Sequence, residues 1–110
     1  MLIEKKEKYT LISSDENPFS DFYNAFLKKE NGLDKENLIL HIFNKINISK
    51  DNYLLLLSVT QQKKENGTSF VMVYNNINID DFPENFNIVP TLIEAEDIIE
   101  MEAMERELGF

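Results

Sequence analysis

Among the residues that could do chemistry, His41 comes first because it is the only histidine of the chain. A histidine can act as a general base beside a serine nucleophile, or as a metal ligand. In the segment 37–43 (NLILHIF), a strand would place His41 on the face opposite Leu40 and Ile42. The sequence identifies no serine and carboxylate arranged around it, so we expect an ordinary sheet histidine and not a catalytic one.

Metal and phosphate chemistry have equally little support. The chain contains no cysteine, which excludes disulfides and thiolate metal sites. A turn with a helix cap explains Asp80-Asp81 better than a metal site does. The only glycines, Gly32, Gly67 and Gly109, lie too far apart for a phosphate-binding loop. We therefore predict no catalytic residue, no cofactor and no bound metal, and we expect that the protein is not an enzyme.

Negative charge is concentrated near the C-terminal end of the chain. The net charge is −9, and the segment 91–110 contains one cation, Arg106, against Glu94, Glu96, Asp97, Glu100, Glu102, Glu105 and Glu107. Such a surface repels nucleic acids and anionic membranes and suits a basic protein surface, although the solubility of an exposed helix explains it equally well. No apolar run reaches the ~18 residues of a membrane helix, and the first residues lack the features of a signal peptide. We expect a cytoplasmic protein that binds neither nucleic acid nor membranes.

Hydrophobic patterning predicts a single domain over residues 1–110. Two extended runs, at 2–3 and 9–13, flank the charged string EKKEK and indicate an N-terminal hairpin or a bent edge strand. A helix follows, opened by Asn17-Pro18 and ended by Asn31-Gly32. Its apolar face is predicted from the spacing i, i+3, i+4, i+7 of Phe19, Phe22, Tyr23 and Phe26.

The segments 37–43 and 68–74 are apolar on both faces, which is typical of interior strands in a parallel sheet. Between them we predict a helix that begins near Ser49. Because Leu54 to Leu57 cover almost every side of this helix, we expect it to be heavily buried. A right-handed crossover would make the two strands parallel neighbours. With a short strand at 86–89, the expected fold is an α/β sandwich with a mixed sheet of four to five strands.

The last helix, predicted over 91–108 with Thr91 as its cap, has two apolar stripes. At about 100° per residue, the first stripe consists of Leu92, Ala95, Ile98 and Ile99. Glu102 stands where this stripe would continue, and a second stripe of Met101, Met104 and Leu108 lies on a different side. We predict that the first half packs on the domain, while the second extends beyond the sheet and offers a Met-rich surface to a partner. The alternative is a helix whose second stripe is covered by a bend or by the rest of the domain.

Several strings of the sequence resemble the STAS family, the domain of sulfate transporters and anti-sigma-factor antagonists. EKKEKYTLIS looks like the opening strand pair, ENLILHIFN like the central strand and KENGTSFVMV like the helix-to-strand return. In that central strand, an Asp commonly stands at the place of His41. The tail FNIVPTLIEAEDIIEMEAMERELGF is similar to the end of a small STAS-like group from Bacteroidetes. The resemblance covers nearly the whole chain and implies a STAS-like fold.

The resemblance also implies the place of a regulatory switch. In the family, a Ser or Thr after an Asp, at the start of the helix that follows the central strand, is phosphorylated, and this breaks binding to a kinase anti-sigma factor. The corresponding stretch here consists of Ser49, Lys50, Asp51 and Asn52. An ungapped alignment places the acceptor on Lys50, which cannot serve, and a slip of one residue places it on Ser49. Since Ser49 is also an ordinary helix cap, we expect a degenerate switch.

Members of the Bacteroidetes group also resemble proteins that are often labelled ribonuclease Z. A real ribonuclease Z is a metallo-β-lactamase-type hydrolase with a His-x-His-x-Asp-His zinc motif, which a chain with one histidine cannot build. What stays open is a physical association with such a nuclease.

The sequence therefore favours a non-enzymatic protein-interaction domain, similar to anti-sigma-factor antagonists, that acts in cytoplasmic regulation. Its partner would be another protein, either one with a basic surface or an anti-sigma kinase, and a homodimer is a further option. Two alternatives stay open. One is a small accessory subunit of an RNA-processing enzyme of the ribonuclease Z type, and the other is a small-ligand or nucleotide sensor.

Overall fold

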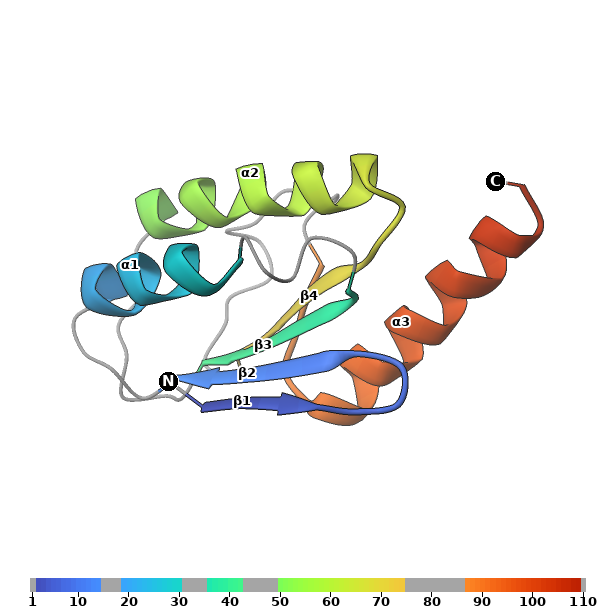
Figure 1. The fold of residues 1–110 in the computed structure, drawn as a ribbon, viewed down its shortest axis with the longest axis horizontal. Coiled ribbons are helices and arrows are strands. Elements are labelled where there is room, and N and C mark those ends of the chain that lie inside the picture. The colour runs from blue at the N-terminus through green and yellow to red at the C-terminus, as the bar shows by residue number, and fades with distance from the viewer. Residues whose placement is uncertain (1, 15–18, 31–35, 43–49, 75–86, 110) are drawn as a thin grey trace.

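The computed structural model describes residues 2–14, 19–30, 36–42, 50–74 and 87–109, which form an α/β fold around a five-stranded mixed sheet (Figure 1). The strands lie in the order β1-β2-β3-β4-β5. Their bounds are Leu2–Lys5, Thr10–Ser14, Leu38–Ile42, Phe70–Val73 and Ile88–Val89. The helices are α1 (Phe19–Glu30), α2 (Lys50–Glu65) and α3 (Leu92–Glu107). The predicted α/β class and the mixed sheet are confirmed.

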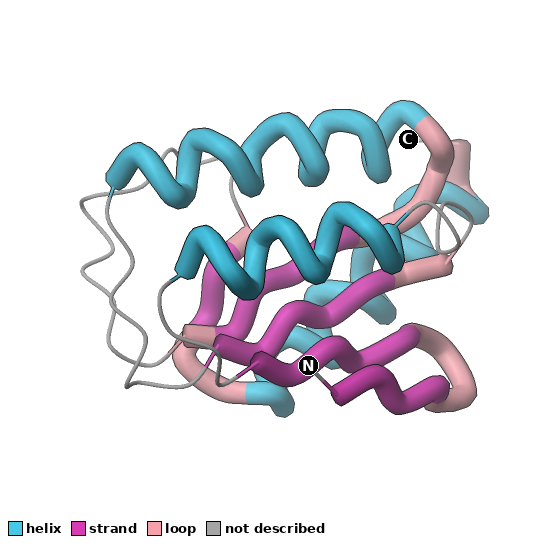
Figure 2. Tube along the Cα trace, turned by 60° about the vertical axis from the view of Figure 1, so that its left-hand side comes forward, coloured by secondary structure: helices cyan, strands magenta, loops and turns pink. Residues whose placement is uncertain are grey.

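The strand pairing follows the patterns read from the sequence. Strands β1 and β2 form the predicted antiparallel hairpin, in which Leu2 pairs with Ser13. From β2 to β5, all neighbouring strands are parallel. Strands β3 and β4 are the predicted parallel neighbours, with Leu38 opposite Phe70. Helix α2 connects them over one face of the sheet, where it lies beside α1 (Figure 2).

Helices α1 and α2 bury the larger part of the core on this face. Phe22 and Phe26 of α1 and Leu56 of α2 belong to one buried cluster with Leu40 and Phe70 of the sheet. The rings of Phe22 and Phe26 are stacked with centroids 6.0 Å apart, and Phe26 meets Phe70 edge-on at 6.1 Å. Aromatic pairs of this geometry add to the stabilisation that burial gives. The amphipathic helix predicted from the aromatic spacing is confirmed.

The heavy burial predicted for α2 is wrong. Leu56 is fully buried, but Leu54 and Leu55 are 52% and 46% exposed. Consecutive helical residues point about 100° apart, so a run of leucines faces several directions at once. Only one side of α2 meets the sheet, and no described element covers its outer side (Figure 1). The exposed leucines therefore lie on that outer side.

Helix α3 covers the opposite face of the sheet (Figure 1). Ala95 and Ile99 are buried there in a second cluster, together with Ile39 of β3 and Val71 and Val73 of β4. Strands β3 and β4 are thus covered on both faces, which explains why their sequences are apolar throughout.

The predicted cap of α3 is confirmed. Thr91 caps α3, because its Oγ1 accepts a hydrogen bond from the backbone N–H of Glu94 at 3.2 Å. Gly67 follows α2 with φ of +77°, the left-handed conformation that glycine adopts most readily. The ends predicted for α1, Asn17-Pro18 and Asn31-Gly32, lie outside the described residues.

The one-sided burial of α2 predicts unequal effects for two adjacent leucines. Leu56→Ala should lower the free energy of unfolding by about 2–5 kcal/mol, because it removes a buried side chain and leaves a cavity. Leu55→Ala should lower it by less than about 1 kcal/mol, since half of that side chain is already in water. Urea denaturation of both variants measures the difference, and equal losses would contradict the orientation of α2.

Candidate interaction surface on the C-terminal helix

The inner side of α3, apolar in its first half, becomes polar in its second half. Asn87 Nδ2 donates a hydrogen bond to Glu102 Oε2 at 2.9 Å. Arg106 Nη1 donates to Ser69 Oγ, next to the start of β4, at 3.1 Å. Glu102 therefore continues the side of α3 that faces the sheet, as a hydrogen-bonding residue. The extension of the helix beyond the sheet stays a prediction, because contact with the domain continues as far as Arg106.

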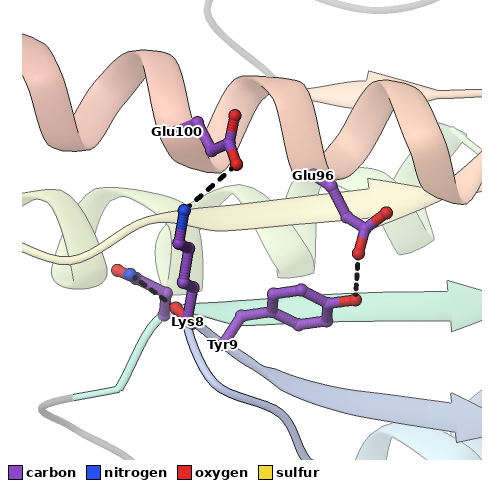
Figure 3. A network of polar contacts seen from close by, with 5 residues as sticks. Lys8, Tyr9, Glu96 and Glu100 are labelled. Carbon is purple, nitrogen blue, oxygen red and sulfur yellow. Dashed lines mark hydrogen bonds and ion pairs between the residues drawn. The ribbon is translucent and has the colours of Figure 1, made fainter.

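Two further contacts attach one flank of α3 to the β1–β2 hairpin (Figure 3). Tyr9 Oη donates to Glu96 Oε2 at 2.7 Å, and Lys8 Nζ donates to Glu100 Oε1 at 3.2 Å. Asn37 Nδ2 donates to the backbone carbonyl of Lys8 at 3.1 Å, which joins the hairpin to the start of β3. The side chains of the Lys8–Glu100 ion pair are 61% and 57% exposed, so water and salt screen it. The Tyr9–Glu96 hydrogen bond is the stronger attachment.

The electrostatic environment of Tyr9 suits this attachment. Burial raises the pKa of the phenol, and the hydrogen bond to Glu96 and its negative charge raise it further, from 10.0 to about 12. The phenol is therefore protonated at neutral pH and donates to the carboxylate. Tyr9 holds α3 in position and offers no phenolate for catalysis.

The outward side of α3 carries exposed apolar side chains. Met101, Met104 and Leu108 are 54%, 61% and 71% exposed, whereas Ala95 and Ile99 are buried. The predicted contrast in exposure between the two stripes is confirmed. Whether the exposed side chains contact a partner stays a prediction.

Ile93 belongs to the same side of the helix and was missed in the sequence. It is 72% exposed and lies four residues before Asp97, which lies four before Met101. We call the residues Ile93, Asp97, Met101, Met104 and Leu108 the outer stripe. The signal was present in the sequence as the spacing of four, four, three and four residues, but Asp97 interrupted the apolar pattern.

Acidic side chains flank the outer stripe on both sides. At about 100° per residue, the exposed residues Glu94 and Glu105 lie along one flank, and Glu100 and Glu107 lie along the other. Arg106, the only cation of α3, is hydrogen-bonded on the inner side. The surface is thus an apolar strip with an acidic rim, a combination that suits a partner with apolar and cationic side chains.

Two hollows adjoin the outer stripe. One has a volume of about 490 Å³, and its lining includes Met104, Ala103 and Glu107. The other has a volume of about 380 Å³, and its lining includes Ile93 and Asp97. Both lie on the flank of α3 that faces the hairpin, since Lys8 and Glu100 line each of them. The hollows are therefore open beside the outer stripe.

The structure does not describe the side chains of the expected switch. Ser49 lies outside the described residues. Lys50, Asp51 and Asn52 are described only as the start of α2. The degenerate switch therefore stays a prediction.

His41 has the surroundings of a sheet residue. Strand alternation places it on the face of β3 that contains Ile39, where it is half-buried, and burial lowers its pKa below 6.5. Within the described ranges, no group of three or more metal-ligating side chains occurs. The pair Asp80-Asp81 lies outside those ranges.

A buried lysine, Lys63, was also missed in the sequence. It is 1% exposed, and its Nζ donates to the backbone carbonyl of Glu36 at 3.1 Å. The carboxylate of Glu36 in turn pairs with Lys5 at 3.3 Å. These contacts connect the end of α2 to β1 and to the segment before β3, which is a structural role. No pattern marked Lys63 in advance, because lysine is ordinarily exposed.

Comparisons with known proteins add no assignment. No model of a known protein family matches the sequence, and no curated protein is significantly similar to it. None of the helices that the structure describes is long and apolar enough to cross a membrane. The features of the described residues that point to a function are therefore the outer stripe, its acidic rim and the contacts that orient α3.

The raised pKa of Tyr9 predicts a loss of stability in alkaline solution. The folded protein holds the phenol proton more tightly than the unfolded chain, whose tyrosine pKa is near 10.0. This contribution is complete below pH 10 and is lost as the pH rises toward 12. Denaturant unfolding across that range should show a steeper loss in the wild type than in Tyr9→Phe. Parallel pH profiles of the two proteins would contradict the raised pKa of Tyr9.

Proposed function

We propose that this chain is a non-enzymatic protein-interaction domain that binds its partner through the outer stripe of α3. The observation that carries the proposal is the exposure of Ile93, Met101, Met104 and Leu108, each more than half exposed and all on one side of one helix. Single exposed apolar residues are ordinary, but a run of them along one side of a helix with a polar rim, here interrupted only by Asp97, is typical of an interaction site. Methionine suits such a site because its flexible side chain adapts to different surfaces.

The regulatory class that we propose is that of the STAS-like domains related to anti-sigma-factor antagonists, acting in the cytoplasm. Its support is the resemblance of the opening, central and C-terminal strings. The mixed sheet, with an antiparallel first strand and α1 and α2 on one face, is compatible with this class. The second candidate is an accessory subunit of an RNA-processing enzyme of the ribonuclease Z type, favoured by the acidic rim, which suits a basic protein surface.

Replacement of both methionines tests the role of the outer stripe. Met101→Ser with Met104→Ser should lower the free energy of unfolding by less than about 1 kcal/mol, because both side chains are largely in water. Affinity capture from the native cell, followed by mass spectrometry, should recover a partner with the wild type and lose it with this variant. The matched control is Leu54→Ser with Leu55→Ser, which alters exposed leucines on the other face of the sheet and should retain the partner. A fall of several kcal/mol in the isolated monomer, on the order of 2–5 for each methionine, would show a core role instead.

The identity of the captured partner separates the two classes. An anti-sigma kinase would support the regulatory class, and a nuclease would support the accessory subunit. A partner that binds the double-methionine variant as well as the wild type would refute the proposed site.

The degenerate switch makes a separate prediction. An anti-sigma serine kinase from the same genome should not phosphorylate this protein efficiently, because Lys50 occupies the acceptor position of the ungapped alignment. Intact-mass measurement after incubation with the kinase and ATP tests this expectation. A stoichiometric phosphate on Ser49 would show that the alignment with the one-residue slip is correct.

A further inference from the structure

The outer stripe has the spacing that another helix would recognise. Its residues follow one another at intervals of four, four, three and four, and intervals of three and four are those at which helices interlock their side chains. The stripe extends over roughly 22 Å at 1.5 Å per residue, the length of about four helical turns. It lies about 180° around α3 from the inner residues Ala95, Ile99, Glu102 and Arg106. Helix α3 thus has one side for its own sheet and a second side with the geometry of a helix–helix seam.

Charge argues against a second copy of this chain as the occupant. Pairing two α3 helices along their outer stripes would bring the rims together. Glu94 and Glu105 lie on one rim and Glu107 on the other, where Glu100 is paired with Lys8 of its own hairpin. Like charges placed opposite one another across an interface are unfavourable. Self-pairing would also bury Asp97 within the seam without a cation, and an unpaired buried charge is strongly destabilising.

We infer that the outer stripe binds a basic amphipathic helix of a partner protein. The apolar seam of that helix would cover Ile93, Met101, Met104 and Leu108, while lysine or arginine side chains on its flanks meet the acidic rim. One cation placed within the seam would meet Asp97 and thereby fix the register of the two helices, as single polar residues do in coiled coils. The inference rests on the proposed function, for which it names the class of partner.

Three labelled peptides of equal length test the inference with the full chain. The first has a leucine seam at intervals of three and four with lysines on its flanks. The second has the same seam with glutamates on its flanks, and the third has the composition of the first in scrambled order. Fluorescence anisotropy should show the first peptide binding at least about tenfold more tightly than either of the others. Its affinity should fall as salt is added, because the rim contacts are screened.

Two variants locate the binding surface. Met101→Ser with Met104→Ser should weaken binding of the first peptide by about tenfold or more, and Asp97→Lys should weaken it by repelling the cations. Leu54→Ser with Leu55→Ser, the matched control on α2, should leave the affinity unchanged. All four side chains of the two double variants, and Asp97, are exposed, and circular dichroism establishes that each variant is folded.

Several results would overturn the inference. Equal binding of the scrambled peptide would show attraction by charge alone, and preference for the acidic peptide would contradict the role of the rim. Analytical ultracentrifugation that shows self-association, abolished by Met101→Ser with Met104→Ser, would identify a second copy as the occupant. If this variant loses its native partner while no peptide preference exists, the partner class is wrong and the proposed function stands. If the native partner is retained, the proposed function itself fails.

Discussion

Coverage of the parallel strands on both faces is the constraint on which the rest of the structure depends. On one face of strands β3 and β4, Leu40 and Met72 belong to one buried cluster. On the other face, Ile39 and Val71 belong to the second. Leaving either face open would return this apolar surface to water, at about 25 cal/mol for each Å². Helices α1 and α2 share one face, and α3 is the helix that the structure describes on the other. A helix that covers a sheet face in a single layer has its outward side in water. Apolar residues on that side do not stabilise the fold by burial, so they need another explanation.

Polar contacts decide which side of α3 faces outward. Ala95 and Ile99 are buried, and Leu92 and Ile98 pack partly buried beside them. Because hydrophobic burial is non-directional, this packing alone does not fix the rotation of α3 about its axis. The bond from Tyr9 fixes the flank, and the bonds of Glu102 and Arg106 fix the inner side of the second half. A rotated helix would leave these groups without their partners. The outer stripe is therefore held as a defined surface, and little ordering of α3 is needed when a partner binds.

The sequence predicted those features that depend on local spacing or on two-sided burial. These are the hairpin, the parallel pair β3 and β4, the Thr91 cap and the exposure of Met101 and Met104. The predictions from sequence were wrong where burial depends on the direction in which a helical side chain points. The apolar content of residues 54–57 does not reveal that α2 has only one covered side, which leaves Leu54 and Leu55 exposed. Glu102 was read as the end of a packing stripe, because its partner Asn87 is reached only through the fold.

Part of the acidic rim is unfavourable for the stability of α3. Glu105 and Glu107 lie near the C-terminal end of the helix, where the helix dipole presents its negative end. An anion in that position is unfavourable by about 0.3–1 kcal/mol, whereas Glu94 in the first turn is favourable. Solubility requires net charge but not charge at this place, and the chain has a net charge of −9 in any case. The cationic partner proposed above would remove this cost, because it would neutralise the acids beside Met104 and Leu108 as it covers the apolar stripe.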